Sequence, residues 1–168
     1  MRPAPNEAVP YYFNYIDRVQ SDDVVQVLAT QLEEAVEFLA SVSEAKSLHR
    51  YAPDKWSLRE LLNHINDTER LFVFRALWFA RGFEEPLPSF DQNVAVSSSG
   101  ADAVSWNDLV NEFRSIRQST VAFFRTLPDD AWDRAGIASD NPFTVRALAY
   151  IAAGHVTHHI DVIRSRYL

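Results

Sequence analysis

Proline and glycine divide this chain into a few long segments, and this division limits its fold more than any other property. The eight prolines and four glycines mostly cluster between segments that carry apolar residues three and four positions apart. That spacing is typical of one face of an amphipathic helix. The segments cover residues 20–48, 57–81, 104–127 and 143–168. The sequence therefore predicts an all-α fold, a four-helix bundle.

Polar residues at the predicted helix starts fit the role of N-caps. Ser57 and Glu60 have the spacing of a capping box, in which each side chain bonds the other residue's backbone N–H. Ser21 is expected to cap the first helix, and Ser105 or Asn107 the third. Together these residues predict where each helix begins.

The connections between the helices predict their order in space. A short link joins the first two helices, which should be antiparallel neighbours. Residues 83–103 form a long connection between helices 2 and 3, able to cross the bundle, and loops of this length are often functional. One extra helical turn is expected at 129–132, and no segment alternates apolar and polar residues as a strand would.

The length of 168 residues suits one domain over 1–168, with residues 1–19 as an N-terminal extension. This extension is rich in aromatic side chains, which we expect to pack on the bundle. A dimer contact or a lid over a pocket is the alternative. The aromatic residues are Tyr11, Tyr12, Phe13 and Tyr15.

Composition excludes several classes of protein. The net charge of −7 does not favour binding to nucleic acid phosphates, and the absence of cysteine excludes disulfides and thiolate ligands. No apolar run is long enough to cross a membrane, and the N-terminus does not resemble a signal peptide. We therefore expect a cytoplasmic protein that binds neither nucleic acid nor membranes.

Three of the five histidines fall within five residues near the C-terminus. His155 and His159 are four positions apart, so they lie on one helix face and can bind one metal ion. Ile151 and Ile163 lie on the same face, which indicates that the pair points into the core. His64, on the apolar face of the second helix, is the third candidate ligand. A core histidine without a metal is the alternative for each.

The other two histidines are expected outside the site. His158 shares a more polar stripe with Asp161 and Ser165, so we place it at the rim, with a role at a pocket edge as the alternative. His49 follows the periodic part of the first helix and is expected at the surface.

Several sequence blocks resemble the DinB-like superfamily of metal-binding four-helix bundles, which includes YfiT-type hydrolases and bacterial thiol transferases. The resemblance covers nearly the whole chain. It is carried by YAPDKWS at 51–57, LNHINDTER at 62–70, PLPSFD at 86–91 and GHVTHH at 154–159. It implies an up-down-down-up bundle with a long crossover, metal ligation by His64, His155 and His159, and a homodimer.

Three imidazoles suit zinc, nickel or a similar divalent ion and leave a coordination position open, as catalytic sites do. The function we expect is metal-dependent thiol transfer. The thiol must be an external low-molecular-weight compound, because the chain has no cysteine. A hydrolase that uses metal-activated water is the first alternative. A non-catalytic stress-response module, in which the metal joins two helices, is the second.

Carboxylates near the histidines are candidates for supporting roles. Asp67 and Glu69 could act as general bases or orient a ligand, and Asp161 and Asp91 are weaker candidates. A solvent-exposed position or a turn is the alternative for each of them. Gly154, next to His155, indicates close approach of another helix or a ligand. Trp56 is expected to be a core aromatic residue at the start of the second helix.

Overall fold

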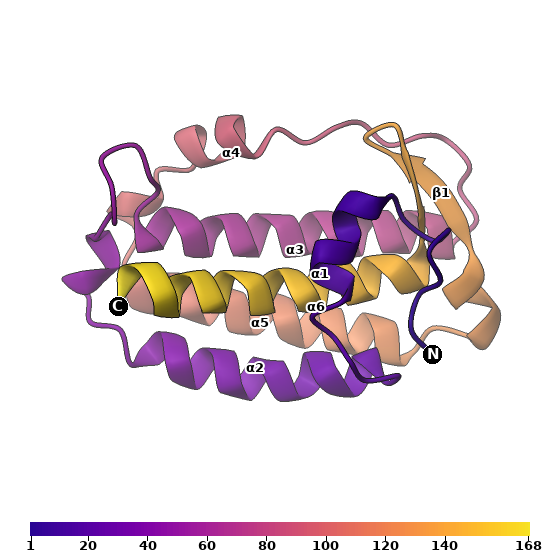
Figure 1. Cartoon of the computed structure of the whole chain (residues 1–168), viewed down its shortest axis with the longest axis horizontal. Coiled ribbons are helices and arrows are strands. Elements are labelled where there is room, and N and C mark those ends of the chain that lie inside the picture. Colours follow the sequence, from indigo (N-terminus) through magenta and orange to yellow (C-terminus); the bar gives the residue numbers. More distant parts are fainter.

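The computed structural model describes residues 1–168 and contains four long helices that lie side by side (Figure 1). The helices are α1 (Phe13–Ile16), α2 (Val24–Ala40), α3 (Leu58–Ala80), α4 (Gln92–Ser99), α5 (Trp106–Arg125) and α6 (Val145–Val162). The strands β1 (Ala135–Ala138) and β2 (Asn141–Thr144) form an antiparallel pair. Short 3-10 turns lie at Pro10–Tyr12, Lys46–Leu48, Ala101–Ala103 and Asp129–Asp133, and a π turn, Ile163–Tyr167, continues α6.

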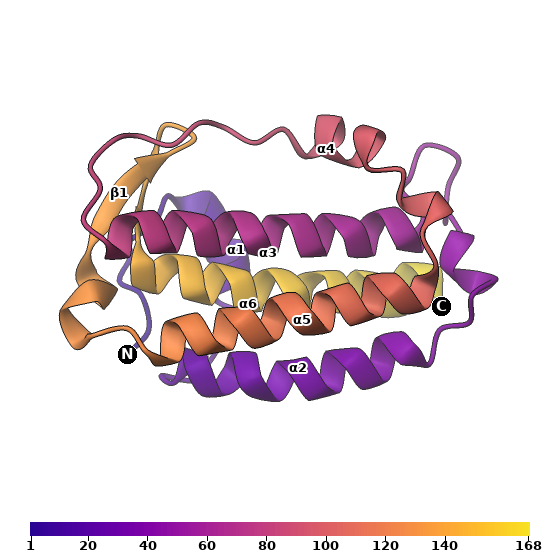
Figure 2. The ribbon, with the colours of Figure 1, turned by 180° about the vertical axis from the view of Figure 1, so that it is seen from behind.

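The predicted bundle and its up-down-down-up topology are confirmed. The expectation that the first two long helices are neighbours is wrong, because α2 packs on α5 and α6, which separate it from α3. Helices α3 and α5 run in the same direction, whereas α2 and α6 run in the opposite one (Figures 1 and 2). The connection between α3 and α5 returns along the whole length of α3, which two parallel neighbours require. This crossover includes α4, a short helix that periodicity does not predict because only Val96 is buried in it.

The helix starts agree with the sequence at two of the three predicted caps. Ser57 and Glu60 form the capping box of α3, and the Ser105 side chain caps α5. The predicted cap at Ser21 is wrong. Asp23 caps α2 instead, because its carboxylate accepts the backbone N–H of Gln26 at 3.0 Å. Helix α2 is also shorter than the predicted 20–48 and ends at Ala40.

The prediction that the chain contains no strands is wrong for residues 135–144. Ser139 and Asp140 link β1 to β2, and both have positive φ, which is typical of a tight hairpin turn. Each strand has only four residues, too few for alternation to be visible in the sequence. The extra turn expected at 129–132 is confirmed as the 3-10 turn Asp129–Asp133.

The hydrophobic core consists of two clusters, one towards each end of the bundle. Between them, the long helices contribute buried or half-buried polar side chains, which we call the polar layer: Gln31 from α2, His64, Thr68 and Glu69 from α3, Arg117 and Thr120 from α5, and His155 from α6. Apolar packing on both sides therefore holds the polar layer in place. None of the helices combines the length and apolar character that crossing a membrane requires.

Candidate metal centre

The structure brings His64, His155 and His159 together at the edge of the polar layer. The Nε2 atom of His155 lies 3.2 Å from that of His64 and 3.0 Å from that of His159. One ring nitrogen from each residue lies within 4.8 Å of the other two. Helices α3 and α6 are packed neighbours, so 91 residues of sequence separation become direct contact.

Hydrogen bonds alone do not account for both short contacts of His155. Two nitrogens at about 2.0–2.1 Å from a tetrahedral ion lie roughly 3.3–3.4 Å apart, so the observed 3.2 and 3.0 Å are a few tenths of an ångström shorter than in a metal-bound pair. A neutral imidazole nitrogen either donates one hydrogen or accepts one, so the Nε2 atom of His155 cannot serve both neighbours well. The group has three members, with no carboxylate or further imidazole in it, which leaves room for another ligand.

The surroundings keep all three imidazoles neutral. Burial lowers the pKa of His64 to about 4 and that of His159 to about 2. Burial and then the neighbouring imidazoles His159 and His64 hold the pKa of His155 well below its ordinary value. Neutral rings present the nitrogen lone pairs that a metal needs.

The far sides of two rings differ in their partners. The Nδ1 atom of His155 lies 3.4 Å from the Thr68 hydroxyl, which itself donates to the His64 carbonyl at 2.7 Å. A hydrogen on His155 Nδ1 can therefore point at a free lone pair of Thr68, which leaves Nε2 as the ligand atom. The Nδ1 atom of His159 is buried without a partner.

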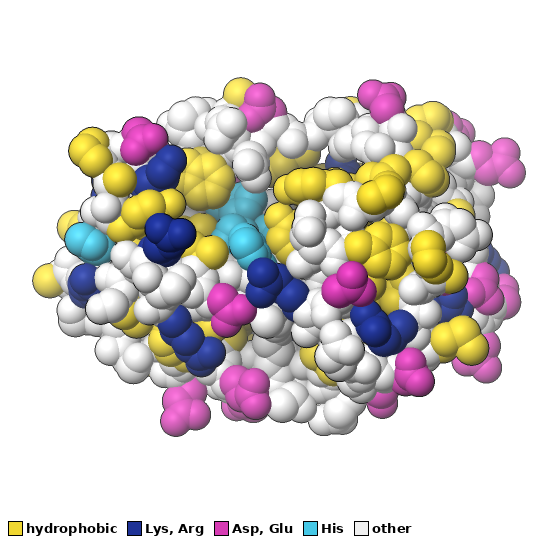
Figure 3. Space-filling model, viewed as in Figure 1, with side chains coloured by type: hydrophobic (Ala, Val, Ile, Leu, Met, Phe, Trp, Pro, Cys, Tyr) yellow, Lys and Arg dark blue, Asp and Glu magenta, His cyan; other side chains and the backbone are white.

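Two cavities reach the three histidines. The first, of about 120 Å³, is lined by His64 and His155 and extends to Arg75; we call it the Arg75 cavity. The second, of about 360 Å³, is lined by His159 and extends to Tyr167; we call it the Tyr167 cavity. Figure 3 shows histidine side chains at the bottom of a hollow on this face of the molecule. Small molecules can therefore approach the centre by two routes.

Aromatic rings surround the centre. Tyr15 from α1 lies edge-on to His155 and His158, with ring centroids 5.3 and 5.5 Å away. Trp56, just before α3, is half-buried and lies 5.0 Å from the His64 ring, so it packs on the site as well as on the core. The N-terminal aromatic residues both pack on the bundle and line the Arg75 cavity, where Tyr11, Tyr12 and Tyr15 form one wall.

His158 and His49 lie outside the triad. His158 is half-buried, lines the Tyr167 cavity beside His159 and belongs to its rim. Burial lowers its pKa, and the charge of Arg18 acts in the same direction. His49 is exposed and packs edge-on against Tyr167.

Glu69 is buried, not solvent-exposed, and its carboxylate is fully engaged. Only 2% of the residue is exposed, and Arg117 donates to both of its oxygens at 2.7 Å. The Thr120 hydroxyl adds a third hydrogen bond at 2.8 Å. Arg117 is in turn bonded to Gln31 of α2. Glu69 lines neither cavity, so its contacts suit a structural role in the polar layer.

The other candidate carboxylates have partners outside the triad. Asp67 accepts from Asn63 at 2.8 Å and lines a separate groove beneath α4, where burial raises its pKa. Asp161 is exposed and paired with Arg18 at 3.0 Å. Asp91 is the N-cap of α4 and accepts from two backbone N–H groups. None of the three therefore lines either histidine cavity.

Gly154 is explained by α1, which crosses α6 beside His155. A Cβ atom at this position would lie 2.5 Å from the carbonyl carbon of Tyr15 and closer still to its oxygen. The absence of a side chain thus lets α1 approach and place Tyr15 against the histidines.

Arg75 is a functional candidate that the sequence analysis missed. It lies on α3, eleven residues after His64, and lines the cavity that reaches His64 and His155. Eleven residues are close to three full helical turns, so the two side chains share one face. A charged residue on the inward face of the helix that carries His64 was the available signal.

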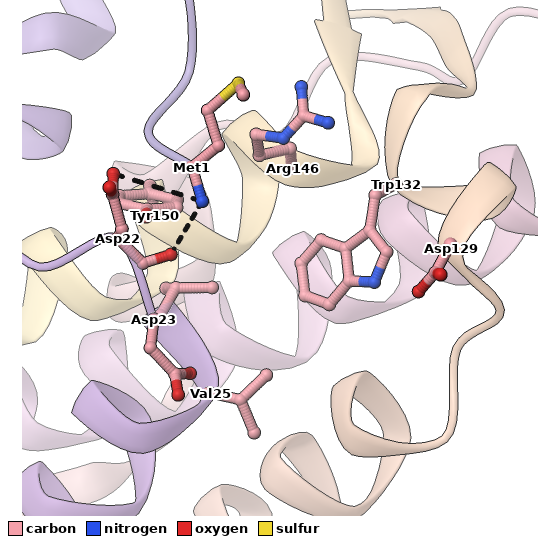
Figure 4. Close-up of a pocket in the computed structure, with 9 residues that line it drawn as sticks. Met1, Asp22, Asp23, Val25, Asp129, Trp132, Arg146 and Tyr150 are labelled. Atoms are coloured by element: carbon pink, nitrogen blue, oxygen red, sulfur yellow. Dashed lines mark hydrogen bonds and ion pairs between the residues drawn. The ribbon is translucent and has the colours of Figure 1, made fainter.

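A further cavity of about 280 Å³ lies apart from the histidines and is lined by residues such as Asp22, Trp132 and Tyr150 (Figure 4). The amino group of Met1 donates to the Asp22 carbonyl at 2.8 Å. Arg146 also lines it, and its guanidinium is paired with Glu7 at 3.0 Å. Most of its charged groups are thus already partnered, and no histidine lines it.

Comparison with solved structures gives the same fold. YfiT from Bacillus subtilis, described as a probable metal-dependent hydrolase with an unusual four-helix bundle topology, superposes with a TM-score of 0.69 at 17% identity. The match covers 98% of this chain and 92% of that protein. A mycothiol-dependent maleylpyruvate isomerase superposes with a TM-score of 0.70 at 13% identity. That match covers 87% of this chain but only 62% of the isomerase.

No curated protein matches this sequence. A family model, however, covers most of the chain: the model of the DinB superfamily matches residues 28–163, which include all three histidines of the centre. The chain belongs to the DinB superfamily.

Proposed function

We propose that this protein is a metal-dependent thiol transferase that joins an external low-molecular-weight thiol to a small electrophile. His64, His155 and His159 would hold the metal, with zinc and nickel as the expected ions. The observation that carries the proposal is the meeting of two cavities at three convergent, neutral imidazoles. A two-substrate reaction needs two binding regions that share one reactive centre.

A divalent ion at this site would supply Lewis acidity, which lowers the pKa of a thiol in its open coordination position. The chain's own residues do the rest. The imidazoles stay neutral, Thr68 orients His155, and the rings of Tyr15, Trp56 and Phe72 limit the access of water. In the transfer, the thiol would release its proton to solvent, a carbon–sulfur bond would form, and the electrophile's leaving group would depart with the bonding electrons.

The carboxylates favour thiol transfer over hydrolysis. Metal-assisted hydrolysis gains from a general base within hydrogen-bond reach of the attacking water. No carboxylate lines the Arg75 cavity, and the one in the Tyr167 cavity, Asp54, is exposed and bonded to Lys55. The same reasoning makes Asp67 and Glu69 poor candidates for a catalytic base.

Hydrolysis stays the second candidate because YfiT, the neighbour that covers 98% of this chain, is described as a probable metal-dependent hydrolase. A non-catalytic structural metal is less favoured, since a closed site would use four protein ligands and only three gather here. A homodimer and a cytoplasmic location remain predictions from the sequence.

One set of assays separates these candidates. The metal-loaded protein is incubated with 1-chloro-2,4-dinitrobenzene and, in turn, cysteine, glutathione and mycothiol, and separately with p-nitrophenyl esters without thiol. We expect thiol conjugation that needs added zinc or nickel and disappears in His155→Ala. Ester hydrolysis in the assay without thiol, together with no thiol conjugation in the other assay, would establish the hydrolase instead. No turnover in either assay would favour the structural metal.

A further inference from the structure

Arg75 is one of three buried arginines, and the only one without an acidic partner. Arg59 is paired with Glu44, and Arg117 with Glu69. Arg75 is 2% exposed, and no carboxylate lies within 4.0 Å of it. A buried charge without a partner destabilises a fold, so a buried Arg75 without an acidic partner indicates a functional role.

The groups that contact the guanidinium are neutral and leave part of it free. Nη2 donates to the Pro88 carbonyl at 3.2 Å and to the Ser139 hydroxyl at 2.8 Å. Nε is buried and has no partner. Burial lowers the pKa of Arg75, and the neighbouring Tyr12 phenol opposes that shift. The free donor and the positive charge together create a site for an anion.

The Arg75 cavity connects this charge to the candidate metal centre. Its lining runs along one face of α3 from His64 through Thr68 to Arg75, and across to Ser139 in the hairpin turn. Arg75 and His64 line this same cavity, and His64 lies in the direction of the helix N-terminus, towards which long helical side chains generally lean. A ligand anchored at Arg75 would thus direct its other end at the imidazoles.

We propose that Arg75 binds the carboxylate of a small organic acid, whose remaining part extends through the cavity to the histidines and carries the electrophilic carbon. This inference rests on the proposed function for the identity of the reacting group, but not for the anion site itself. The fork of a guanidinium matches the planar carboxylate. A carboxylate places one negative charge at the guanidinium and a phosphate dianion places two there, and no other lysine or arginine lines the cavity to balance the second.

Binding can be tested on the metal-free protein, independently of catalysis. Succinate is titrated into protein labelled with nitrogen-15, and the arginine Nε–H signals are followed by NMR. Inorganic phosphate is the alternative anion, and succinamide is the neutral control. The Arg75 signal is assigned by its loss in Arg75→Lys. We expect succinate to shift this signal and to raise the melting temperature, with phosphate weaker and succinamide without effect.

Variants show whether the charge itself binds the acid. Arg75→Met should weaken succinate binding by about tenfold or more, because a charge-assisted hydrogen-bonded pair is lost, and Arg75→Lys should fall between. The matched control is Arg146→Met. That arginine also lines a cavity (Figure 4). It is already paired with Glu7 and Asp133, so its removal should leave succinate binding unchanged.

Three results would overturn the inference: no shift of the Arg75 signal with succinate, equal binding by wild type and Arg75→Lys, or a larger response to phosphate than to succinate. Should Arg75→Met fail to fold, the wild-type titration and Arg75→Lys still decide. If succinate binds at Arg75 but no thiol conjugation is found with any electrophile, the anion site stands and the proposed function fails.

Discussion

Replacing Gly154 by alanine sets two effects of opposite sign against each other. In the interior of a helix, alanine is more favourable than glycine by about 0.5–1 kcal/mol. Here, however, the new Cβ would lie 2.5 Å from the carbonyl carbon of Tyr15. Carbon atoms in contact are about 3.5–4.0 Å apart, so α1 and α6 must separate by roughly 1 Å or more.

The obstacle is backbone, which cannot rotate away as a flexible side chain can. Overpacking of this kind costs about 1–3 kcal/mol, and we expect the upper part of that range. After subtraction of the gain in helix propensity, Gly154→Ala should lower the free energy of unfolding by roughly 1–2 kcal/mol. Because α1 carries Tyr15, the displacement also opens the aromatic wall beside His155.

Urea denaturation of the metal-free protein measures this change. Ala122→Gly, at an exposed position of α5, gives the helix-propensity effect alone and should cost about 1 kcal/mol. If Gly154→Ala were instead more stable than wild type by about the same amount, the close packing of α1 on α6 would be refuted.

Further predictions concern protonation and the polar layer. The metal-free protein should have constant stability above about pH 6.5 and lose stability as the pH falls towards 4. In the unfolded chain His64 binds a proton near its ordinary pKa of about 6.5, whereas in the folded protein it does so only near pH 4. The slope should be about 1.4 kcal/mol per pH unit for each such histidine, and flat stability from pH 7 to 4.5 in urea titrations would contradict neutral, buried imidazoles. Glu69→Gln should cost about 3–5 kcal/mol, since it leaves the Arg117 charge buried without its partner. Metal content and the rate constant per folded molecule should stay unchanged in that variant, and a rate loss without a stability loss would restore Glu69 as a catalytic base.

Periodicity and punctuation were sufficient to predict the bundle, its crossover and the inward faces of the helices. Long helices repeat their pattern over several turns, so the pattern of α3 or α6 is unambiguous. The hairpin at 135–144 and α4 escaped prediction because each is shorter than the window in which a period can be recognised. Their positions depend on contacts with the rest of the fold, such as the backbone bond from Leu87 to Ile137.

The site was predictable to the extent that its residues share one helix face. His155 and His159 are four positions apart, and His64 lies on an apolar stripe, so all three were identified before the structure placed them together. The charged residues behaved differently. For Glu69 the sequence leaves a general base, a residue that orients a ligand and an exposed carboxylate as alternatives. It cannot show that Arg117, 48 positions away, neutralises a buried Glu69.

Arg75 was missed for a related reason. Most arginine side chains extend to solvent. Only the packing of α3 against the crossover and the hairpin turn shows that Arg75 is buried. Gly154 illustrates the opposite case. A glycine in mid-helix already indicated a close approach, and the structure identifies α1 as the partner.

The metal content of the purified protein and four histidine variants tests the central claim most directly. Protein loaded with zinc or nickel and freed of excess ion should retain about one ion per chain, the number that three protein ligands can hold. His64→Ala, His155→Ala and His159→Ala should each lose it, whereas His158→Ala, on the cavity rim, should retain it. Retention by the three triad variants, or an equal loss in His158→Ala, would contradict the proposed metal centre.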